Sequence, residues 1–232
     1  MGDVYTFAWT GAALFAGSLL HFAWRFFGPF GTPAPDGTSM ASAIAIDFAL
    51  FTVFALHHSV LARSGVKAAL IRHIPPAIER ATYVWVASLL FIGVCAAWQP
   101  VPGLLWHITG PAAWGLGALS LVGAWLTLHS AVILDVFELA GTRPFMRPRP
   151  GAAEFTAQGP YGLVRHPIYL AWLFLVWTPT SMTGTRLVFA AISTFYLVVA
   201  IPFEERTLRA SAGPSYATYA ARVRWRMVPF LY

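Results

Sequence analysis

Charged residues are scarce in this sequence: Asp, Glu, Lys and Arg together make up 10% of its 232 residues. A soluble domain typically carries about a quarter, so the composition excludes a water-soluble globular protein. Cysteine is scarcer still, because Cys95 is the only one. A single thiol cannot form an intramolecular disulfide, which excludes a disulfide-stapled scaffold. Hydrophobic residues account for 58%, which indicates that lipid is the solvent for most of the chain.

The apolar residues come in blocks, and a bilayer-crossing helix needs about 20 of them. Blocks of that order cover residues 4–27, 40–62, 81–98 and 112–134. Two further runs, 168–177 and 187–203, are divided by a short polar segment, and the first is too short to span alone. We therefore predict an all-α, polytopic transmembrane bundle of about four spans, followed by a C-terminal helical hairpin whose two ends face the same side.

The predicted boundary within this one membrane domain lies between residues 134 and 135. Before it come the N-terminal transmembrane helices, and the span that ends at 134 contains Gly115, Gly117 and Gly123. Small residues let neighbouring helices approach closely in lipid, so we expect this span to pack inside the bundle. After it come a polar, Pro-rich loop up to His166, the hairpin and an amphipathic tail, which we expect at the membrane surface. A loop of that length is uncommon without a function.

The cations predict an orientation. Thirteen of the 15 Lys and Arg residues fall in three segments, which alternating spans place on one side of the membrane. These cations are Arg63, Lys67, Arg72, Arg80, Arg143, Arg147, Arg149, Arg165, Arg206, Arg209, Arg222, Arg224 and Arg226. By the positive-inside rule, this side and both termini are cytoplasmic. Topology and attraction to anionic membrane lipids explain the net charge of +6, and no basic stripe on a soluble domain suggests a nucleic-acid partner.

Ionisable residues inside a predicted span are costly and indicate function by default. Asp47, His57, His58 and His129 are of this kind, and Glu138 follows shortly after a span. The alternative for the two adjacent histidines is a satisfied position inside the bundle. We predict no metal site, because neither histidine has a His or Cys four residues away and a single thiol cannot build a zinc centre.

The densest polar cluster runs from Gly159 to Tyr169 and is followed 35 residues later by Glu204 and Glu205. Pro167 suits the first turn of a helix, whose free N–H groups and positive dipole end favour a carboxylate. Arg165 and His166 add charge there, and the hairpin brings the two glutamates back to the same surface. Such a pocket, basic at one corner and acidic at the other, fits a zwitterionic cofactor. The alternative is a juxtamembrane anchor in which Glu pairs with Arg.

These segments resemble a known family. GPYGLVRHPIYL, the later FEERTL and the closing GPSYATYAARVRWRMVPF resemble the C-terminal signature of integral-membrane methyltransferases that use S-adenosylmethionine, which include isoprenylcysteine carboxyl methyltransferase and phospholipid methyltransferases. Upstream, FALHHSVLAR, ERATYVWVASLLF and LDVFELAG resemble the bacterial methanethiol S-methyltransferases. The resemblance implies S-adenosylmethionine as cofactor and a location in the bacterial inner membrane, with the cofactor site on the cytoplasmic side.

Carried over residue by residue, the resemblance implies a set of cofactor-binding positions. They are Tyr161, Val164, Arg165, His166, Tyr169, Glu204, Glu205, Tyr219 and Arg222. The chain departs from the methanethiol group at His57-His58-Ser59-Val60, where relatives typically have Gln-His-Ser-Val. Of the two histidines, only His58 keeps its counterpart there. Asp135 and Glu138 also stand at positions that vary between relatives. Both departures affect the implied identity of the methyl acceptor more than that of the cofactor.

Methyl transfer is an in-line displacement, which requires alignment of acceptor and methyl group and an acceptor in its nucleophilic state. For a small or lipid-soluble thiol we predict His58 as general base, helped by Glu138 or Asp135, and Arg165 as a further catalytic residue. Two alternatives stay open. One keeps the cofactor but methylates a phospholipid amine or a prenylcysteine carboxylate. The other is a haem-binding, isomerase-like membrane protein, in which His57, His58 or His129 would be an axial ligand.

Overall fold

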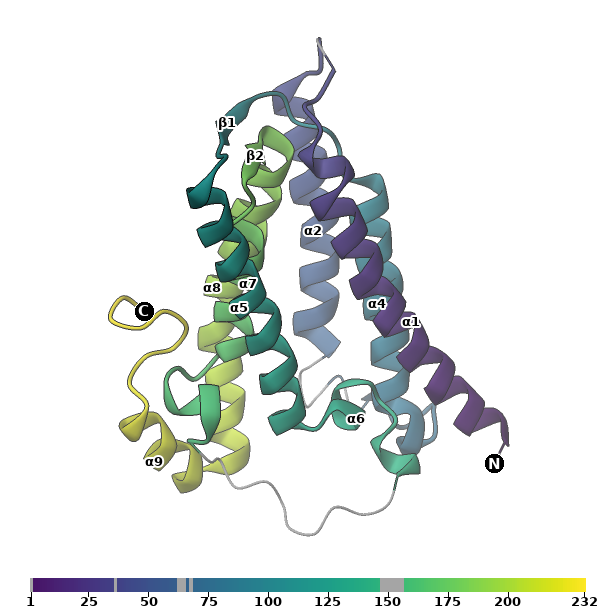
Figure 1. Ribbon diagram of the computed structural model, residues 1–232. Helices are drawn as coiled ribbons and strands as arrows, with labels where there is room; N and C mark the ends of the chain where they lie inside the picture. Colours follow the sequence, from purple (N-terminus) through teal and green to yellow (C-terminus); the bar gives the residue numbers. More distant parts are fainter. Residues whose placement is uncertain (1, 36, 62–65, 67–68, 147–156) are drawn as a thin grey trace. The chain divides into compact units, whose positions relative to one another are not determined.

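The structure is a computed structural model that describes residues 2–35, 37–61, 66, 69–146 and 157–232. Almost all of its regular secondary structure is helical, and the chain divides into two compact units (Figure 1). The first unit holds α1, α2, α4, the strands β1 and β2, α6 and the start of α8 as far as Ile192; the second holds α5, α7, α8 from Ser193 onward, and α9. Short 3-10 turns lie at Pro29–Gly31, Pro76–Ile78, Arg143–Phe145 and Gly159–Gly162.

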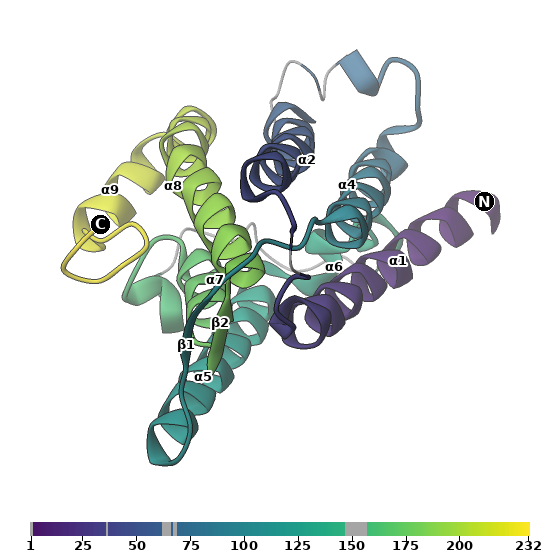
Figure 2. The ribbon, with the colours of Figure 1, turned by 90° about the horizontal axis from the view of Figure 1, so that it is seen from above.

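In the first unit, α1 (Gly2–Phe27) lies along α4 (Glu79–Ala97), and α2 (Met40–Leu61) also packs on α4 (Figures 1 and 2). The Trp85 ring stacks on Phe7 with centroids 5.7 Å apart. Its indole nitrogen donates to the Phe7 carbonyl at 2.9 Å, so the close approach of α1 and α4 is fixed by a packed ring and a hydrogen bond together. Phe26, Phe189 and Trp98 pack together in the core of this unit.

Two short strands join the helices of the first unit. β1 (Leu104–His107) pairs antiparallel with β2 (Ser181–Thr183), and the Gly184 N–H donates to the Gly103 carbonyl at 2.7 Å. The sequence predicts no strand, so the pairing of β1 with β2 is an addition to the predicted all-α bundle. Its physical reason is that pairing satisfies backbone groups of both segments, which are costly to leave unpaired near lipid.

Arg186 is one of the two cations outside the three basic segments, and the structure explains its position. Its guanidinium is buried and donates to the carbonyls of Phe26 and Phe27 at 2.8 and 2.9 Å, and to that of Ser181 at 2.6 Å. The last carbonyls of a helix have no partner within it. Arg186 therefore caps the end of α1 and ties it to β2.

In the second unit, α5 (Pro111–Leu134) and α7 (Pro167–Trp177) run side by side (Figure 2). Ser120 and Thr178 share a hydrogen bond of 2.6 Å at one end of the pair. At Gly123 a β-carbon would lie 2.9 Å from the Ala171 carbonyl oxygen, whereas Gly115 and Gly117 have no atom within 4 Å of that position. Close packing through small residues is thus present at Gly123 alone of these three glycines.

The hairpin predicted at the C-terminal end is present. Trp172 and Trp177 of α7 donate to Ser193 and Thr194 of α8 (Gly184–Ala212) at 3.0 and 2.9 Å. α8 continues nine residues beyond Phe203, where the apolar run ends, because the Glu, Arg, Leu and Ala residues that follow are good helix formers. α9 (Pro214–Arg222) then buries Tyr216 and Tyr219 on one face, as their spacing predicts. The short α6 (Val136–Leu139) belongs to the first unit.

The chain is an integral membrane protein by the length and composition of its helices. Five described helices are long and apolar enough to cross a membrane, and α7 is a shorter apolar helix. Four of the five coincide within two or three residues with the four predicted spans, and the fifth is α8. The loop cations Arg63, Lys67, Arg147 and Arg149 lie outside the described residues.

Candidate functional site

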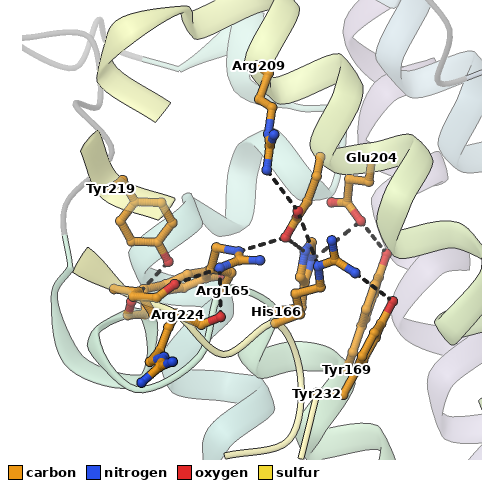
Figure 3. A network of polar contacts seen from close by, with 12 residues as sticks. Arg165, His166, Tyr169, Glu204, Arg209, Tyr219, Arg224 and Tyr232 are labelled. Atoms are coloured by element: carbon orange, nitrogen blue, oxygen red, sulfur yellow. Dashed lines mark hydrogen bonds and ion pairs between the residues drawn. The ribbon is translucent and has the colours of Figure 1, made fainter. Parts of the chain in front are cut away.

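The predicted cofactor residues around the start of α7 meet the glutamates of α8 in the second unit (Figure 3). Pro167 occupies the first turn of α7, and His166 precedes it. Because α7 and α8 form a hairpin, Glu204 and Glu205 return to the beginning of α7. The sequence predicts this meeting, and the structure confirms it. We call Arg165, His166, Tyr169, Glu204, Glu205, Arg209, Arg226 and Tyr232 the arginine–glutamate cluster.

Glu205 is the buried centre of this cluster. Its side chain is 3% exposed, and its Oε1 accepts a hydrogen bond of 2.6 Å from Arg165 Nε, whose side chain is 7% exposed. The other oxygen, Oε2, lies 3.5 Å from Arg226 Nε and 3.7 Å from Arg209 Nη2. Three arginines therefore share one carboxylate. A juxtamembrane anchor would also pair Glu with Arg, but in this protein the pair of Arg165 and Glu205 is buried.

Glu204 is placed differently from its neighbour. Its side chain is 43% exposed, and its Oε2 accepts a hydrogen bond of 2.8 Å from the Tyr169 hydroxyl. His166 Nδ1 lies 3.6 Å from the same oxygen, and the His166 ring stacks on Tyr169 at 5.3 Å. Glu204 thus presents an oriented carboxylate with access from outside.

Burial lowers the pKa of His166 below its ordinary value, and the nearby charges of Glu204 and Glu205 offset this only in part. The imidazole is therefore neutral at pH 7, so the positive charge of the cluster comes from the arginines. His166 Nε2 lies 3.5 Å from Glu205 Oε1, which places the ring between the two glutamates. The sequence predicts added positive charge at His166, and the structure favours a neutral ring stacked on Tyr169 there.

The segment after α9 holds the start of α7 in place. The backbone N–H groups of Arg165 and His166 donate to the carbonyls of Trp225 and Arg226 at 2.9 and 2.8 Å. Arg165 Nη1 donates to the carbonyls of Val223 and Arg224 at 2.7 and 3.0 Å. Arg165 is therefore bound on all sides by its own chain, and its predicted contact with a cofactor carboxylate stays a prediction.

Arg209, Arg226 and Tyr232 belong to the cluster but are absent from the predicted site. Arg226 Nη1 donates to the Tyr232 hydroxyl at 3.2 Å. The tail contains several arginines at irregular spacing, and only the backbone pairing of 225 and 226 with 165 and 166 selects Arg226. No local pattern in the sequence carries that information.

The other predicted cofactor residues lie near the cluster with different surroundings. The Tyr219 hydroxyl donates to the Tyr161 carbonyl at 2.9 Å, which fixes α9 to the turn before α7. Burial raises the pKa of Tyr219 to about 12 and that of Tyr161 well above its usual value. Val164 is fully buried with Leu126, and Arg222 is exposed in the last turn of α9. Their predicted contacts with the cofactor stay predictions.

The predicted base His58 belongs to the first unit. Its Nδ1 shares a hydrogen bond of 2.6 Å with the Tyr83 hydroxyl. The Tyr83 ring stacks on His57 at 5.9 Å and lies 4.8 Å beneath the Arg80 guanidinium. Arg80 Nε donates to the Glu138 backbone carbonyl at 3.3 Å. Tyr83 orients His58 through its hydrogen bond to Nδ1, and no sequence motif marks Tyr83 for that role.

Other ionisable groups in the spans have structural partners. Asp47 is buried in α2, where its Oδ1 accepts a hydrogen bond of 2.7 Å from the Gln99 N–H. His129 of α5 stacks on Trp125 with centroids 5.1 Å apart. Within the described part of the chain, no three His, Cys, Asp or Glu side chains come together as a metal site.

Comparison with known proteins gives one consistent result. The chain is 35% identical over 199 residues to methanethiol S-methyltransferase 2 of Bradyrhizobium diazoefficiens, which covers 84% of this chain and 76% of the relative. It is 37% identical to the methanethiol S-methyltransferase of Mycobacterium tuberculosis, over 79% of this chain and 78% of the relative. For the enzyme of that name from Crocosphaera subtropica the identity is 34%, over 90% and 84%.

No family model matches the chain, and no solved structure is detectably similar to it. The likeness covers at least 79% of this chain and at least 76% of the relative in each of the three. The chain therefore belongs to the methanethiol S-methyltransferase family.

Proposed function

We propose that this protein transfers a methyl group from S-adenosylmethionine to methanethiol or a similarly small thiol. The observation that carries the proposal is the identity of 34–37% to methanethiol S-methyltransferases over most of both chains. Five helices that can cross a membrane make it an integral membrane enzyme.

The arginine–glutamate cluster has the chemistry that such a cofactor requires. S-adenosylmethionine carries an ammonium, a sulfonium and ribose hydroxyls, all of which favour a carboxylate partner. Glu204 offers an exposed carboxylate oriented by Tyr169, whereas Glu205 is neutralised by Arg165 inside the protein. We therefore assign direct cofactor binding to Glu204 and Tyr169, and assign to Glu205 and Arg165 the task of holding α7, α8 and the tail together.

The cofactor's own carboxylate needs a cation at the edge of the cluster. Arg226 fits this role, because its side chain is 35% exposed while that of Arg165 is 7% exposed. The positive dipole end of α7 lies beside it, because the Arg226 carbonyl accepts from the His166 N–H just before that helix. When bound, S-adenosylmethionine supplies an activated methyl group, and these residues bind and orient it.

The acceptor thiol must lose its proton, because the thiolate is the nucleophile. We propose His58 as the group that takes the proton, with Tyr83 fixing the ring through the 2.6 Å hydrogen bond to Nδ1. General-base assistance of this kind typically contributes about 10²–10⁴-fold. Glu138 contacts Arg80 through its backbone carbonyl, and its predicted assistance to His58 stays a prediction.

We further propose that the enzyme lies in the bacterial inner membrane with the cluster and both termini on the cytoplasmic side. The support is the concentration of cations in three segments that alternate with apolar blocks. A polar cofactor then reaches the cluster from the cytoplasm, while an apolar thiol reaches the site through the bilayer.

The test is methyl transfer from labelled S-adenosylmethionine by the purified full-length protein. The acceptor panel contains methanethiol, longer alkyl thiols, phosphatidylethanolamine and a prenylcysteine. We expect label in the thioether product of methanethiol. Label in the phospholipid or the prenylcysteine, with none in any thiol, would overturn the proposal in favour of the amine or carboxylate alternative.

A further inference from the structure

An apolar groove lies in the second unit and is lined by α5, α7 and the C-terminal segment. Its volume is about 680 Å³, and its lining residues are hydrophobic apart from Thr178, whose hydroxyl shares a hydrogen bond with Ser120. One wall is a face of α5 that includes Leu119, Val122 and Leu126, and the other is a face of α7 that includes Leu170 and Phe174. From Leu119 to Leu126 the wall is about 10 Å long, at 1.5 Å per residue.

The groove lies on helices that belong in lipid. α5 is a candidate membrane span, and Leu119 and Val122 are exposed on it. The Thr178 hydroxyl is already bonded to Ser120, so an apolar ligand suits this groove better than a polar one. Its volume is within the range of sites that hold one ligand molecule, and its walls are two neighbouring apolar helices.

The C-terminal segment closes one end of the groove and brings a cation to it. Val228 and Pro229 line that end. Trp225 packs against Leu126 and Leu170 of the walls, and the exposed Arg224 lies 5.3 Å over the Trp225 ring. Tryptophan beside arginine is typical of the level of lipid headgroups, and the arginine complements a phosphate.

We propose that this groove binds one acyl chain of an anionic phospholipid, whose headgroup lies at Arg224. The occupant is a lipid because the lining is almost entirely hydrophobic, while Arg224 brings a cation to the side where Trp225 packs on the cluster that contains Leu126 and Leu170. Each arginine near a membrane surface favours an anionic lipid about fivefold over a neutral one. The site is separate from methyl transfer and extends beyond the proposed function.

The experiment measures lipids that copurify with the full-length protein in mild detergent, by native mass spectrometry without cofactor or thiol. Val122→Trp fills the groove, and Val132→Trp adds the same volume at an exposed position of α5 outside it. We expect Val122→Trp to reduce the lipid-bound fraction about tenfold relative to Val132→Trp. Leu119→Trp against Leu121→Trp repeats the comparison one turn away, so that misfolding of one variant still leaves a result.

The headgroup is tested by adding phosphatidylglycerol or phosphatidylcholine to delipidated protein. We expect the wild type to retain phosphatidylglycerol at least fivefold better, and Arg224→Glu to lose this preference while Arg206→Glu, an exposed arginine of α8, keeps it. Equal retention by the groove-filling and control variants would overturn the proposal. So would a bound mass that corresponds to an acceptor molecule or to a second copy of the chain.

Discussion

Arg165 Nε lies 2.6 Å from Glu205 Oε1, and both side chains are almost completely buried. The pair joins a residue two positions before α7 to the beginning of the polar end of α8, forty residues later. Arg165 also donates to two carbonyls of the tail, so one guanidinium connects three segments. Arg165 and Glu205 match the family's cofactor-binding pattern, but in this protein they bind each other.

The two adjacent glutamates therefore respond differently to the same substitution. Glu205→Gln removes the charge that compensates buried Arg165, and breaking a buried pair in this way costs about 3–5 kcal/mol. We expect a clear drop in the thermal unfolding midpoint in detergent. Glu204→Gln, its matched control on the exposed side, should unfold like the wild type and bind S-adenosylmethionine more weakly in calorimetry. If both variants lost stability equally, the assignment of a structural role to Glu205 and a cofactor-binding role to Glu204 would be wrong.

The positions of the membrane spans could be predicted from the sequence, because the bilayer sets the length and polarity of a helix that crosses it. Long apolar runs set the spans, because a helix in lipid must be long and apolar enough to cross it, and α2 and α5 begin within one residue of the expected positions. The strand β1 was missed because its pairing with β2 depends on a contact more than 70 residues away. Arg186 was missed because a buried arginine that caps α1 looks, in sequence, like a stray cation.

The site residues that lie within a local sequence motif could be predicted. Pro167, Arg165 and Glu205 could be expected together once α7 and α8 formed a hairpin. Arg226 and Tyr83 could not, because their partners are chosen by the path of the backbone in one case and by helix packing in the other. The role of each glutamate was likewise hidden, since exposure of 43% at Glu204 and 3% at Glu205 is a property of the fold.

Acidification should destabilise the protein through His166. Its pKa in the folded chain is lowered by burial, so between the ordinary value near 6.5 and the folded value the unfolded chain binds more protons. Stability is therefore complete above about pH 6.5 and is lost as the pH falls. The unfolding midpoint of the wild type should fall between pH 7.5 and 5.5, and His166→Gln should show a shallower fall. Identical slopes would show that His166 is not the responsible group.

The hydroxyl of Tyr83 should matter to thiol methylation. Tyr83→Phe keeps the ring that stacks on His57 but removes the hydrogen bond to His58. We expect lower kcat with little change in KM for S-adenosylmethionine, and a larger loss in His58→Ala, up to about 10²–10⁴-fold. Both losses should be greatest for the least acidic thiols, because these depend most on a base.

His57→Phe is the control for this pair, since it keeps an aromatic ring against Tyr83 and leaves His58 in place. Its rates should stay close to those of the wild type across the thiol panel. A uniform loss across thiols of different acidity in Tyr83→Phe and His58→Ala would instead indicate that the pair serves packing in the first unit.

Two glycines of α5 should respond oppositely to alanine. At Gly123 the new β-carbon would lie 2.9 Å from both the Ala171 carbonyl oxygen and the Phe174 Cβ, so α5 and α7 must separate. Overpacking of this kind costs about 1–3 kcal/mol. At Gly117 nothing lies within 4 Å, and alanine there should stabilise the helix by about 0.5–1 kcal/mol. Unfolding midpoints of the two variants should therefore move in opposite directions, and a shared direction would contradict the α5–α7 packing described for the second unit.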